Sequence, residues 1–502
     1  MGVPSRRTYA LTAFLISLVC YGYFLPKALD WAGNSRADLT FAVGDQGILY
    51  IDTYHENTGD KAFFEGHYYT EKSIGPSLVA LPFYMVFKLI AGVPPIYDFL
   101  QSNHTLGDVA NLRNPDAETL GIRPNTFYED VSLAFITFFA TSVPSALLVT
   151  VLFLLAARFA RKDSYAFALA LIYGLATIAF PYSTVLYQHQ IAAFGLFLGF
   201  FLLWRVIYEQ ANSRWLWVVG GLFGLATITD LPVIPFVGLI FLWGVYQYSN
   251  RLALYRVVLG AVPLLLIHFL YHYLIYGNAL TVSYLYSVYW QDFNQQGVVS
   301  LTAPSAERLY GITVSSFRGL FFISPILLLA LPGLLQMGQQ PRRYRSMTVL
   351  FAFIIAGFFL YNASSVQWWA GHSIGPRYLT PMLPFMALPM IFVFNQWLPR
   401  RPGHVLIGVL FALSAFNVWA QFLAGQVFPP VNGPDGVTIQ NPLVQYALPL
   451  LMRGDITRNY GALLGLPGFL SLIPLLVLVA TIYVLILRQA MWRAQPTVIP
   501  EH

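Results

Sequence analysis

The feature that most constrains the fold of this chain is a long series of apolar segments, each close to 20 residues and almost free of charge. An α-helix of about 20 apolar residues crosses the hydrocarbon core of a bilayer. Hydrophobic residues make up 57% of the chain and charged residues only 10%, whereas about a quarter of a typical soluble domain is charged. The sequence therefore predicts an all-α polytopic membrane protein with residues 1–502 in one domain, and it excludes a string of soluble domains.

Twelve segments qualify as membrane-spanning helices. They are, approximately, residues 8–25, 131–157, 164–182, 191–208, 215–229, 232–247, 256–275, 319–337, 346–362, 378–397, 404–424 and 467–487. A further apolar segment, residues 77–92, is short and contains Pro82 and Lys88. It therefore suits a helix that lies in the membrane interface rather than one that spans the membrane.

The distribution of charge supports this arrangement. If residues 77–92 lie in the interface, one side of the membrane holds 16 of the 28 basic residues and only three of the 22 acidic ones. Cytoplasmic loops are rich in Lys and Arg, so we expect this side, with both termini, to be cytoplasmic. This segregation accounts for the net charge of +6, which therefore does not indicate a nucleic-acid partner. The long outer segments are residues 26–130, 276–318, 363–377 and 425–466, and we expect the function to lie there.

The first outer segment, residues 26–130, is dense in groups that do chemistry beside a membrane. Lys72 precedes the interfacial helix, where a cation meets lipid phosphates, and carboxylates beside such a cation make an acid–base site. Gly75 begins that helix, and its missing side chain is expected to let a ligand approach the backbone. For any one of these acids taken alone, an acid–base role is a weaker explanation than an ordinary solvated loop whose acids balance the basic inner face. The candidate residues are Arg36, Asp38, Asp52, Asp60, His67, Tyr69, Glu71 and Lys72.

Other polar residues stand at the outer ends of predicted spans. Arg377, in a cluster with His372, has a guanidinium suited to bidentate phosphate binding. Arg318 suits a phosphate contact or a headgroup anchor equally well. His189 forms either a second wall of a site or a helix cap, and Asp230 is expected to cap the helix that follows it.

Several classes of site are missing from the sequence. The single Cys20 excludes an internal disulfide and a cysteine metal site. No P-loop, Rossmann glycine pattern or Gly-x-Ser-x-Gly elbow occurs. The predicted cytoplasmic loops are too short for a nucleotide site, which argues against an ATP-driven pump.

The order of these features resembles the GT-C superfamily of lipid-carrier-dependent glycosyltransferases, which have one span, a large acidic outer loop and then a helical bundle. Residues 72–76 (Lys-Ser-Ile-Gly-Pro) are similar to the Lys-Pro-Pro-Leu region of aminoarabinose transferases and the His-Pro-Pro-Leu region of protein O-mannosyltransferases. The matches to a bacterial branch of phospholipid-carrier-dependent glycosyltransferases are Asp52, Asp60, residues 66–69, Lys72, residues 318–320 and residues 371–379.

The resemblance implies a glycosyltransferase of the bacterial inner (plasma) membrane. It would move a sugar from a polyprenyl-phosphate carrier to a hydroxyl of a glycan, lipid or protein acceptor on the outer face. A carboxylate would act as general base, while Lys72, Arg377 and Arg318 would stabilise the donor phosphate. The substrate would be lined by Arg36, His67, Tyr69, Glu71, His189 and His372.

The choice of base is open. Superfamily members carry a catalytic Asp soon after the first span, but that position falls near Asn34, and an Asn cannot act as a base. Asp38 lies a few residues later and Asp30 a few earlier. We take Asp52, Asp60 and Asp38 as candidates, with Asp52 first because its neighbours are apolar and aromatic. Oligosaccharyltransferase-like relatives use a divalent metal, but the sequence offers no carboxylate near His189. We therefore expect no metal and no other cofactor.

Two other functions stay open. A secondary transporter or lipid flippase shares the twelve-span layout, although such proteins usually show repeats and ionisable residues near the bilayer midplane. A polysaccharide polymerase or ligase uses the same kind of donor and carries a large late loop, for which residues 425–466 are suited.

Overall fold

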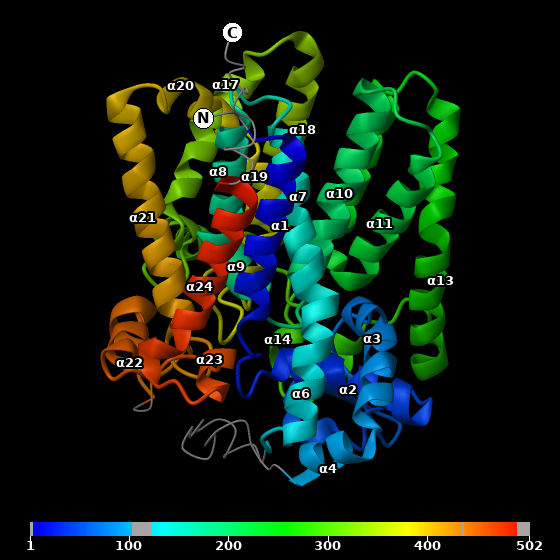
Figure 1. The fold of residues 1–502 in the computed structure, drawn as a ribbon. Helices are drawn as coiled ribbons and strands as arrows, with labels where there is room; N and C mark the ends of the chain where they lie inside the picture. The colour runs from blue at the N-terminus through cyan, green and yellow to red at the C-terminus, as the bar shows by residue number, and fades with distance from the viewer. Residues whose placement is uncertain (1–3, 103–121, 434–435, 489–502) are drawn as a thin grey trace, which may run out of the picture.

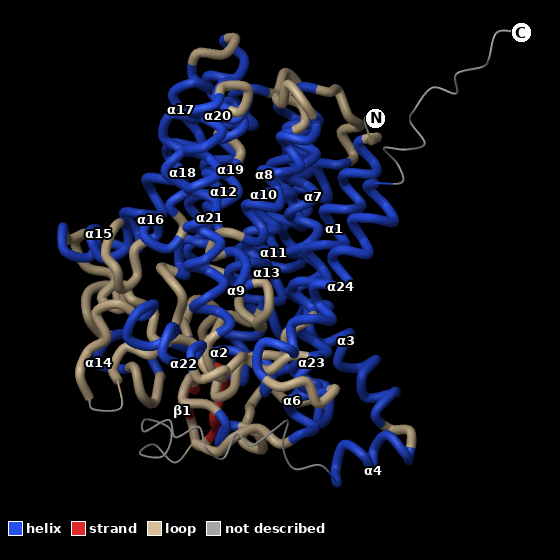
Figure 2. Tube along the Cα trace, turned by 60° about the vertical axis from the view of Figure 1, so that its left-hand side comes forward, coloured by secondary structure: helices blue, strands red, loops and turns tan. Residues whose placement is uncertain are grey.

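The computed structural model describes residues 4–102, 122–433 and 436–488. Long helices run side by side through most of the molecule, and shorter helices, two strands and many loops gather at one end (Figures 1 and 2). In Figure 1, α1 starts at the upper end and α2, α3, α4, α22 and α23 lie at the lower end. We call this lower end the loop end.

The helices of the bundle have the following bounds. The first half comprises α1 (Arg6–Gly22), α6 (Phe127–Thr137), η3 (Phe138–Ser142), α7 (Val143–Ala156), α8 (Asp163–Leu175), α9 (Ala179–Tyr182), α10 (Gln188–Tyr208), α11 (Trp215–Thr229), η4 (Leu231–Val233), α12 (Ile234–Gln247), η5 (Arg251–Leu254) and α13 (Tyr255–Tyr276). The second half comprises α16 (Leu320–Ile323), η7 (Pro325–Leu329), α17 (Ala330–Gly338), α18 (Arg342–Ser364), η8 (Arg377–Met382), α19 (Leu383–Ala387), α20 (Met390–Trp397), α21 (Arg401–Leu423), α24 (Ile473–Ile482) and η11 (Tyr483–Arg488).

The remaining elements belong to the predicted outer segments, except η10, which begins the last predicted span. They are α2 (Trp31–Gln46), η1 (His55–Asn57), β1 (Lys61–Phe64), β2 (His67–Thr70), α3 (Gly75–Ala91), α4 (Pro94–Ser102), η6 (Ser283–Tyr286), α14 (Gln291–Asn294), α15 (Ala306–Thr313), η9 (Leu443–Ala447), α22 (Leu448–Met452), α23 (Tyr460–Leu463) and η10 (Gly468–Leu472). The strands form one antiparallel hairpin with Lys61 opposite Thr70. The Ser35 hydroxyl on α2 bonds both the Asp60 carbonyl, at 2.6 Å, and the Thr70 hydroxyl, at 2.7 Å. These bonds fix the hairpin against α2.

The apolar helices indicate a membrane-embedded protein, but the count of twelve spans is not confirmed. Among the described residues, six helices are long and apolar enough to cross a membrane, or up to eight if each of two bent pairs counts as one span. The count falls because several apolar helices are short or broken. The predicted span at 164–182 is interrupted after Leu175, and that at 319–337 is divided near Pro325 into α16, η7 and α17. Proline removes a backbone donor and interrupts a helix in this way.

The segment predicted at residues 77–92 is found as the helix α3, which meets α4 at an angle of 101°. Large apolar side chains on both helices are exposed, among them Leu89 at 78% and Phe99 at 57%. Such a surface suits contact with lipid.

The prediction that Gly75 lets a ligand approach the backbone is wrong. A Cβ at this position would lie 2.3 Å from the Thr229 hydroxyl and 2.6 Å from the Thr229 Cα. The small side chain makes room for the end of α11 rather than for a ligand.

The first and last outer segments are joined by buried polar contacts. The Arg458 guanidinium lies 2.7 Å from Asp130, at the start of α6. The Lys27 ammonium, which follows α1, donates to the Phe422 carbonyl at 2.7 Å and to the Gly425 carbonyl at 2.9 Å. The loop end is therefore one packed body although its parts are more than 300 residues apart in sequence.

We expect Arg458→Ala to lower the unfolding free energy by about 3 kcal/mol, because it leaves the Asp130 carboxylate buried without its partner. The measurement is the thermal unfolding of the full chain in detergent. Arg453→Ala, at an exposed position of the same segment, is the matched control and should leave the melting temperature unchanged. Equal melting temperatures for the two variants would contradict this role of the ion pair.

Candidate active site

Lys72 lies at the centre of a buried group of charges, directly after β2. Its ammonium is 3.0 Å from the Asp60 carboxylate and also contacts Glu71. The second outer segment closes over this group, since the Trp290 indole donates to Asp60 at 2.8 Å and the Ser287 hydroxyl donates to Glu71. The structure thus brings together three of the sequence-predicted residues, with residues from 276–318 as a cover.

Burial and charge act in opposite directions on this group. Burial raises the pKa of Asp60, but the adjacent Lys72 ammonium outweighs it and holds that pKa below its ordinary value. Burial raises the pKa of Glu71 to about 7, although Lys72 acts against it. Burial lowers the pKa of Lys72, but the two carboxylates outweigh this and raise it. Near neutral pH Lys72 therefore stays charged, Asp60 is its counterion, and Glu71 is part-protonated.

This predicts a stability change with pH that depends on Glu71. The folded pKa of about 7 lies above the ordinary value of 4.5, so the folded state holds this proton more tightly than the unfolded state does. The extra stability is fully present below about pH 4.5 and is lost as the pH rises towards 7, by about 3 kcal/mol in all. We expect thermal unfolding to show this loss in the wild type and not in Glu71→Gln. The exposed Glu307→Gln should follow the wild type, and a parallel fall in all three proteins would contradict the assignment.

Asp30 is a buried carboxylate at the N-terminus of α2. The Tyr187 hydroxyl donates to it at 2.6 Å, and burial raises its pKa despite that bond and the nearby guanidinium groups of Arg377 and Arg36. A helix N-terminus also favours a carboxylate. A carboxylate with a raised pKa beside cations is suited to accept a proton. Asp30 is not among the three bases predicted from the sequence, because the length of the turn before α2 is not visible there.

Arg377 carries a guanidinium that no hydrogen bond or ion pair satisfies within residues 4–102, 122–433 and 436–488. Its Nε is buried without a partner. The guanidinium lies 5.0 Å from the Tyr187 ring centre and 5.8 Å from that of Tyr378. A cation held among aromatic rings with no direct ion pair is suited to bind an anionic ligand.

Arg36 adds a second guanidinium to the same region. It is 1% exposed, bonds the Gln188 side chain and the Ala32 carbonyl, and lies 5.6 Å from the Tyr187 ring centre. Its Nε also lacks a partner among the described side chains and backbone. Tyr187 therefore lies close to two guanidinium groups and donates to Asp30, so one side chain contacts all three charged groups.

His189 and Asp230 form a pair that the sequence did not reveal. His189 Nδ1 lies 3.0 Å from the Asp230 carboxylate, whereas the sequence offered no carboxylate near His189. The two residues are 41 positions apart and meet where α10 begins and α11 ends. The expectation that Asp230 caps the next helix is wrong, because its side chain makes no capping hydrogen bond.

Two of the predicted bases, Asp52 and Asp38, bond groups other than the cations of the candidate site. Asp52 bonds the His67 ring and the Tyr68 amide, both at 2.6 Å, and its side chain is 35% exposed. Asp38 is fully buried and accepts from Asn57 at 3.1 Å. Neither forms an ion pair with a Lys or Arg in the described chain. Of the three predicted bases, only Asp60 directly contacts Lys72.

The remaining residues predicted for the site make contacts within the protein itself. Arg318 is fully buried and donates to the carbonyls of Trp369, Gly371 and Pro429, so backbone oxygens occupy its guanidinium. His372 is half-buried in the loop that Arg318 holds. Tyr69 is 8% exposed and packs 6.2 Å from the Tyr276 ring.

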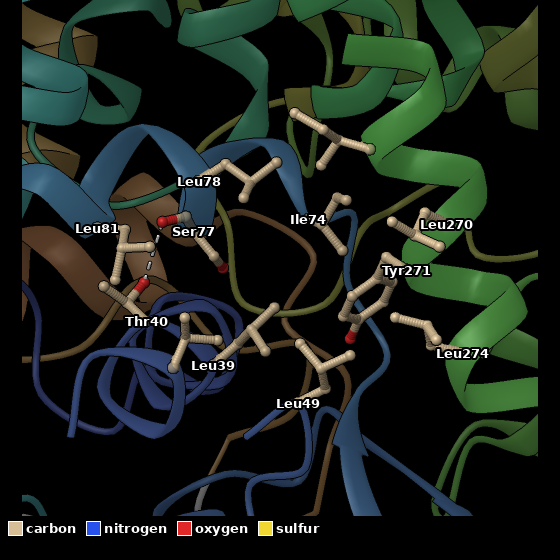
Figure 3. A pocket seen from close by; sticks show the side chains of 12 residues that line it. Leu39, Thr40, Leu49, Ile74, Ser77, Leu78, Leu81, Leu270, Tyr271 and Leu274 are labelled. Carbon is tan, nitrogen blue, oxygen red and sulfur yellow. Dashed lines mark hydrogen bonds between the residues drawn. The ribbon is translucent and has the colours of Figure 1, made fainter. Parts of the chain in front are cut away.

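An apolar cavity of about 200 Å³ lies between α2, α3 and α13. Figure 3 shows the side chains around it, with Tyr271 on one side and Leu39, Thr40 and Leu78 on the other. The Ser77 hydroxyl, in its wall, donates to the Arg36 carbonyl at 2.8 Å. The cavity therefore begins next to the backbone of a site cation. Its lining residues are Leu39, Thr40, Val43, Leu49, Ile74, Ser77, Leu78, Leu81, Ile267, Leu270, Tyr271 and Leu274.

Comparison with known proteins adds no relative. No protein-family model matches the chain, and no curated protein sequence matches it. Within the described residues, no group of three His, Cys, Asp or Glu side chains is arranged to hold a metal ion.

Proposed function

We propose that this protein is a glycosyltransferase that moves a sugar from a polyprenyl-phosphate carrier to an acceptor hydroxyl at the outer face of a membrane. The observation that carries the proposal is the Arg377 guanidinium, which makes no ion pair among the described residues and lies against Tyr187, whose hydroxyl donates to the buried Asp30 carboxylate. A cation without a direct ion pair, close to a candidate base, is the arrangement needed by a reaction whose leaving group is a phosphate.

The groups present match the steps of such a transfer. Asp30 accepts the proton of the acceptor hydroxyl as its oxygen attacks the first carbon of the sugar. The bond from that carbon to the carrier phosphate breaks, and the lipid phosphate leaves as an anion. Arg377 and Arg36 stabilise the negative charge on it. Lys72, already paired with Asp60, holds the hairpin in place.

The apolar surroundings support a lipid-linked donor. The cavity between α2, α3 and α13 suits part of an isoprenoid chain, because its lining is almost wholly apolar and it adjoins Arg36. The exposed apolar faces of α3 and α4 suit a position at the membrane interface. A donor entering from the bilayer would reach the cations without passing through water.

The proposal includes a topology. We place the loop end outside and both termini in the cytoplasm of a bacterial inner membrane, because the basic residues concentrate on the opposite side. With its short and bent helices counted, the chain would cross twelve times in the GT-C manner.

Photo-crosslinking with an undecaprenyl-phosphate analogue tests the proposal. We expect labelling close to Arg377 and along the cavity, near Leu78 and Leu270, and competition by unmodified undecaprenyl phosphate. Labelling only at the cytoplasmic end, or none, would overturn the proposal and favour a transporter or flippase. Transfer onto a growing polysaccharide in a reconstituted assay would instead indicate a polymerase or ligase.

A further inference from the structure

A second atom with unused hydrogen-bonding capacity lies near the proposed site. His189, at the second position of α10, is 1% exposed. Its Nδ1 lies 3.0 Å from Asp230, and because a carboxylate only accepts, Nδ1 carries the ring proton. Its Nε2 is buried and bonds no atom of the described residues.

Nε2 therefore presents a lone pair rather than a proton. A second proton would place an imidazolium ion in a buried position, and burial disfavours an ionised group. A neutral imidazole with a proton on Nδ1 is an acceptor at Nε2. A buried acceptor without a donor is unfavourable, so the atom is suited to a hydrogen-bond donor that arrives with a ligand.

His189 lies close to the residues of the proposed phosphate site. Its ring lies 5.8 Å from that of Tyr378, the residue directly after Arg377. It also lies 6.3 Å from the ring of Tyr187, which itself stands 5.0 Å from the Arg377 guanidinium. A ligand group that reaches Nε2 while its phosphate contacts Arg377 must be joined closely to that phosphate. In a polyprenyl-phosphate donor this group is the sugar.

We propose that His189, oriented by Asp230, binds a hydroxyl group of the transferred sugar as a hydrogen-bond acceptor through Nε2. The inference rests on the proposed function and adds a substrate requirement to it. The donor sugar carries a free hydroxyl beside its phosphate linkage, and the pair positions that sugar for attack. Asp230 acts through His189 and does not itself touch the ligand.

Binding measurements on the full chain in lipid nanodiscs test this without requiring turnover. The probes are undecaprenyl phosphate and undecaprenyl phosphate carrying glucose, mannose or arabinose. We expect the wild type to bind at least one sugar-bearing lipid about 10-fold more tightly than the bare carrier, as one well-placed hydrogen bond allows. His189→Asn keeps an amide that reaches Asp230 but removes the acceptor at Nε2. It should lose this 10-fold preference while binding the bare carrier as the wild type does.

His189→Gln is the matched variant, because its side-chain oxygen reaches the position of Nε2. It should keep most of the preference for the sugar-bearing lipid. Thermal unfolding shows whether this variant folds. If it does not fold, the result with His189→Asn decides the test. The inference is overturned if His189→Asn keeps the preference, or if no sugar-bearing lipid binds better than the bare carrier. Failure of the wild type to bind the bare carrier is a different result, since it would overturn the proposed function itself.

Discussion

Arg377→Ala is expected to reduce sugar transfer by at least about 100-fold, because it removes a preorganised cation from the leaving phosphate. The variant should still fold. The guanidinium has no hydrogen bond or ion pair among the described residues to lose, and its buried, unpartnered Nε is itself unfavourable. The measurement is transfer from the polyprenyl-phosphate sugar by purified protein, with thermal unfolding recorded for the same preparation.

Two further variants make the Arg377 result specific. Arg377→Lys keeps the charge but not the planar fork, so it should recover part of the activity. Arg453→Ala removes a guanidinium from an exposed position of the outer loops and should transfer as the wild type does. Full activity in Arg377→Ala would remove the cation from the mechanism.

Asp30→Asn is expected to lower turnover by about 100-fold or more, since Asn cannot take up the proton of the acceptor hydroxyl. Asn has nearly the same size and can still accept the hydrogen bond from Tyr187. Binding of undecaprenyl phosphate should therefore be retained while the rate falls. The measurement is turnover together with carrier affinity for the same variant.

Asp52→Asn is the matched control for Asp30→Asn. Asp52 was the first choice of base from its neighbours in sequence, but its carboxylate is partly exposed and bonds His67 and the Tyr68 amide. We now expect Asp52→Asn to change turnover by no more than about threefold. If Asp52→Asn abolishes transfer and Asp30→Asn does not, the base belongs at Asp52 and our assignment to Asp30 is wrong.

Local sequence predicted the helical segments well. Residues 215–229 form α11 with the predicted bounds, and the segments predicted at 191–208 and 404–424 are close to α10 and α21. These predictions need only the hydropathy of contiguous residues. The number of crossings could not be obtained in this way, because breaks such as that between α8 and α9 shorten helices that their composition makes look continuous.

The candidate site was predicted only in part. Lys72 and Asp60 lie in and near one short hairpin, so their proximity follows from local sequence. Arg318 illustrates the limit, because its suitability as a phosphate ligand depends on whether its donors are free. They are occupied by the Trp369, Gly371 and Pro429 carbonyls, two of them in a loop 50 residues away and one still more distant.

The sequence by itself determined that this is a helical membrane protein whose candidate site residues concentrate in the loops at one end, since burial of apolar segments and segregation of charge depend on composition along the chain. Only the tertiary structure decided which of those residues meet. Asp30 reaches Tyr187, and His189 reaches Asp230, across 157 and 41 positions of the chain. Contacts of this kind depend on how helices pack, because the packing sets which side chains share a buried space and which are left without a partner.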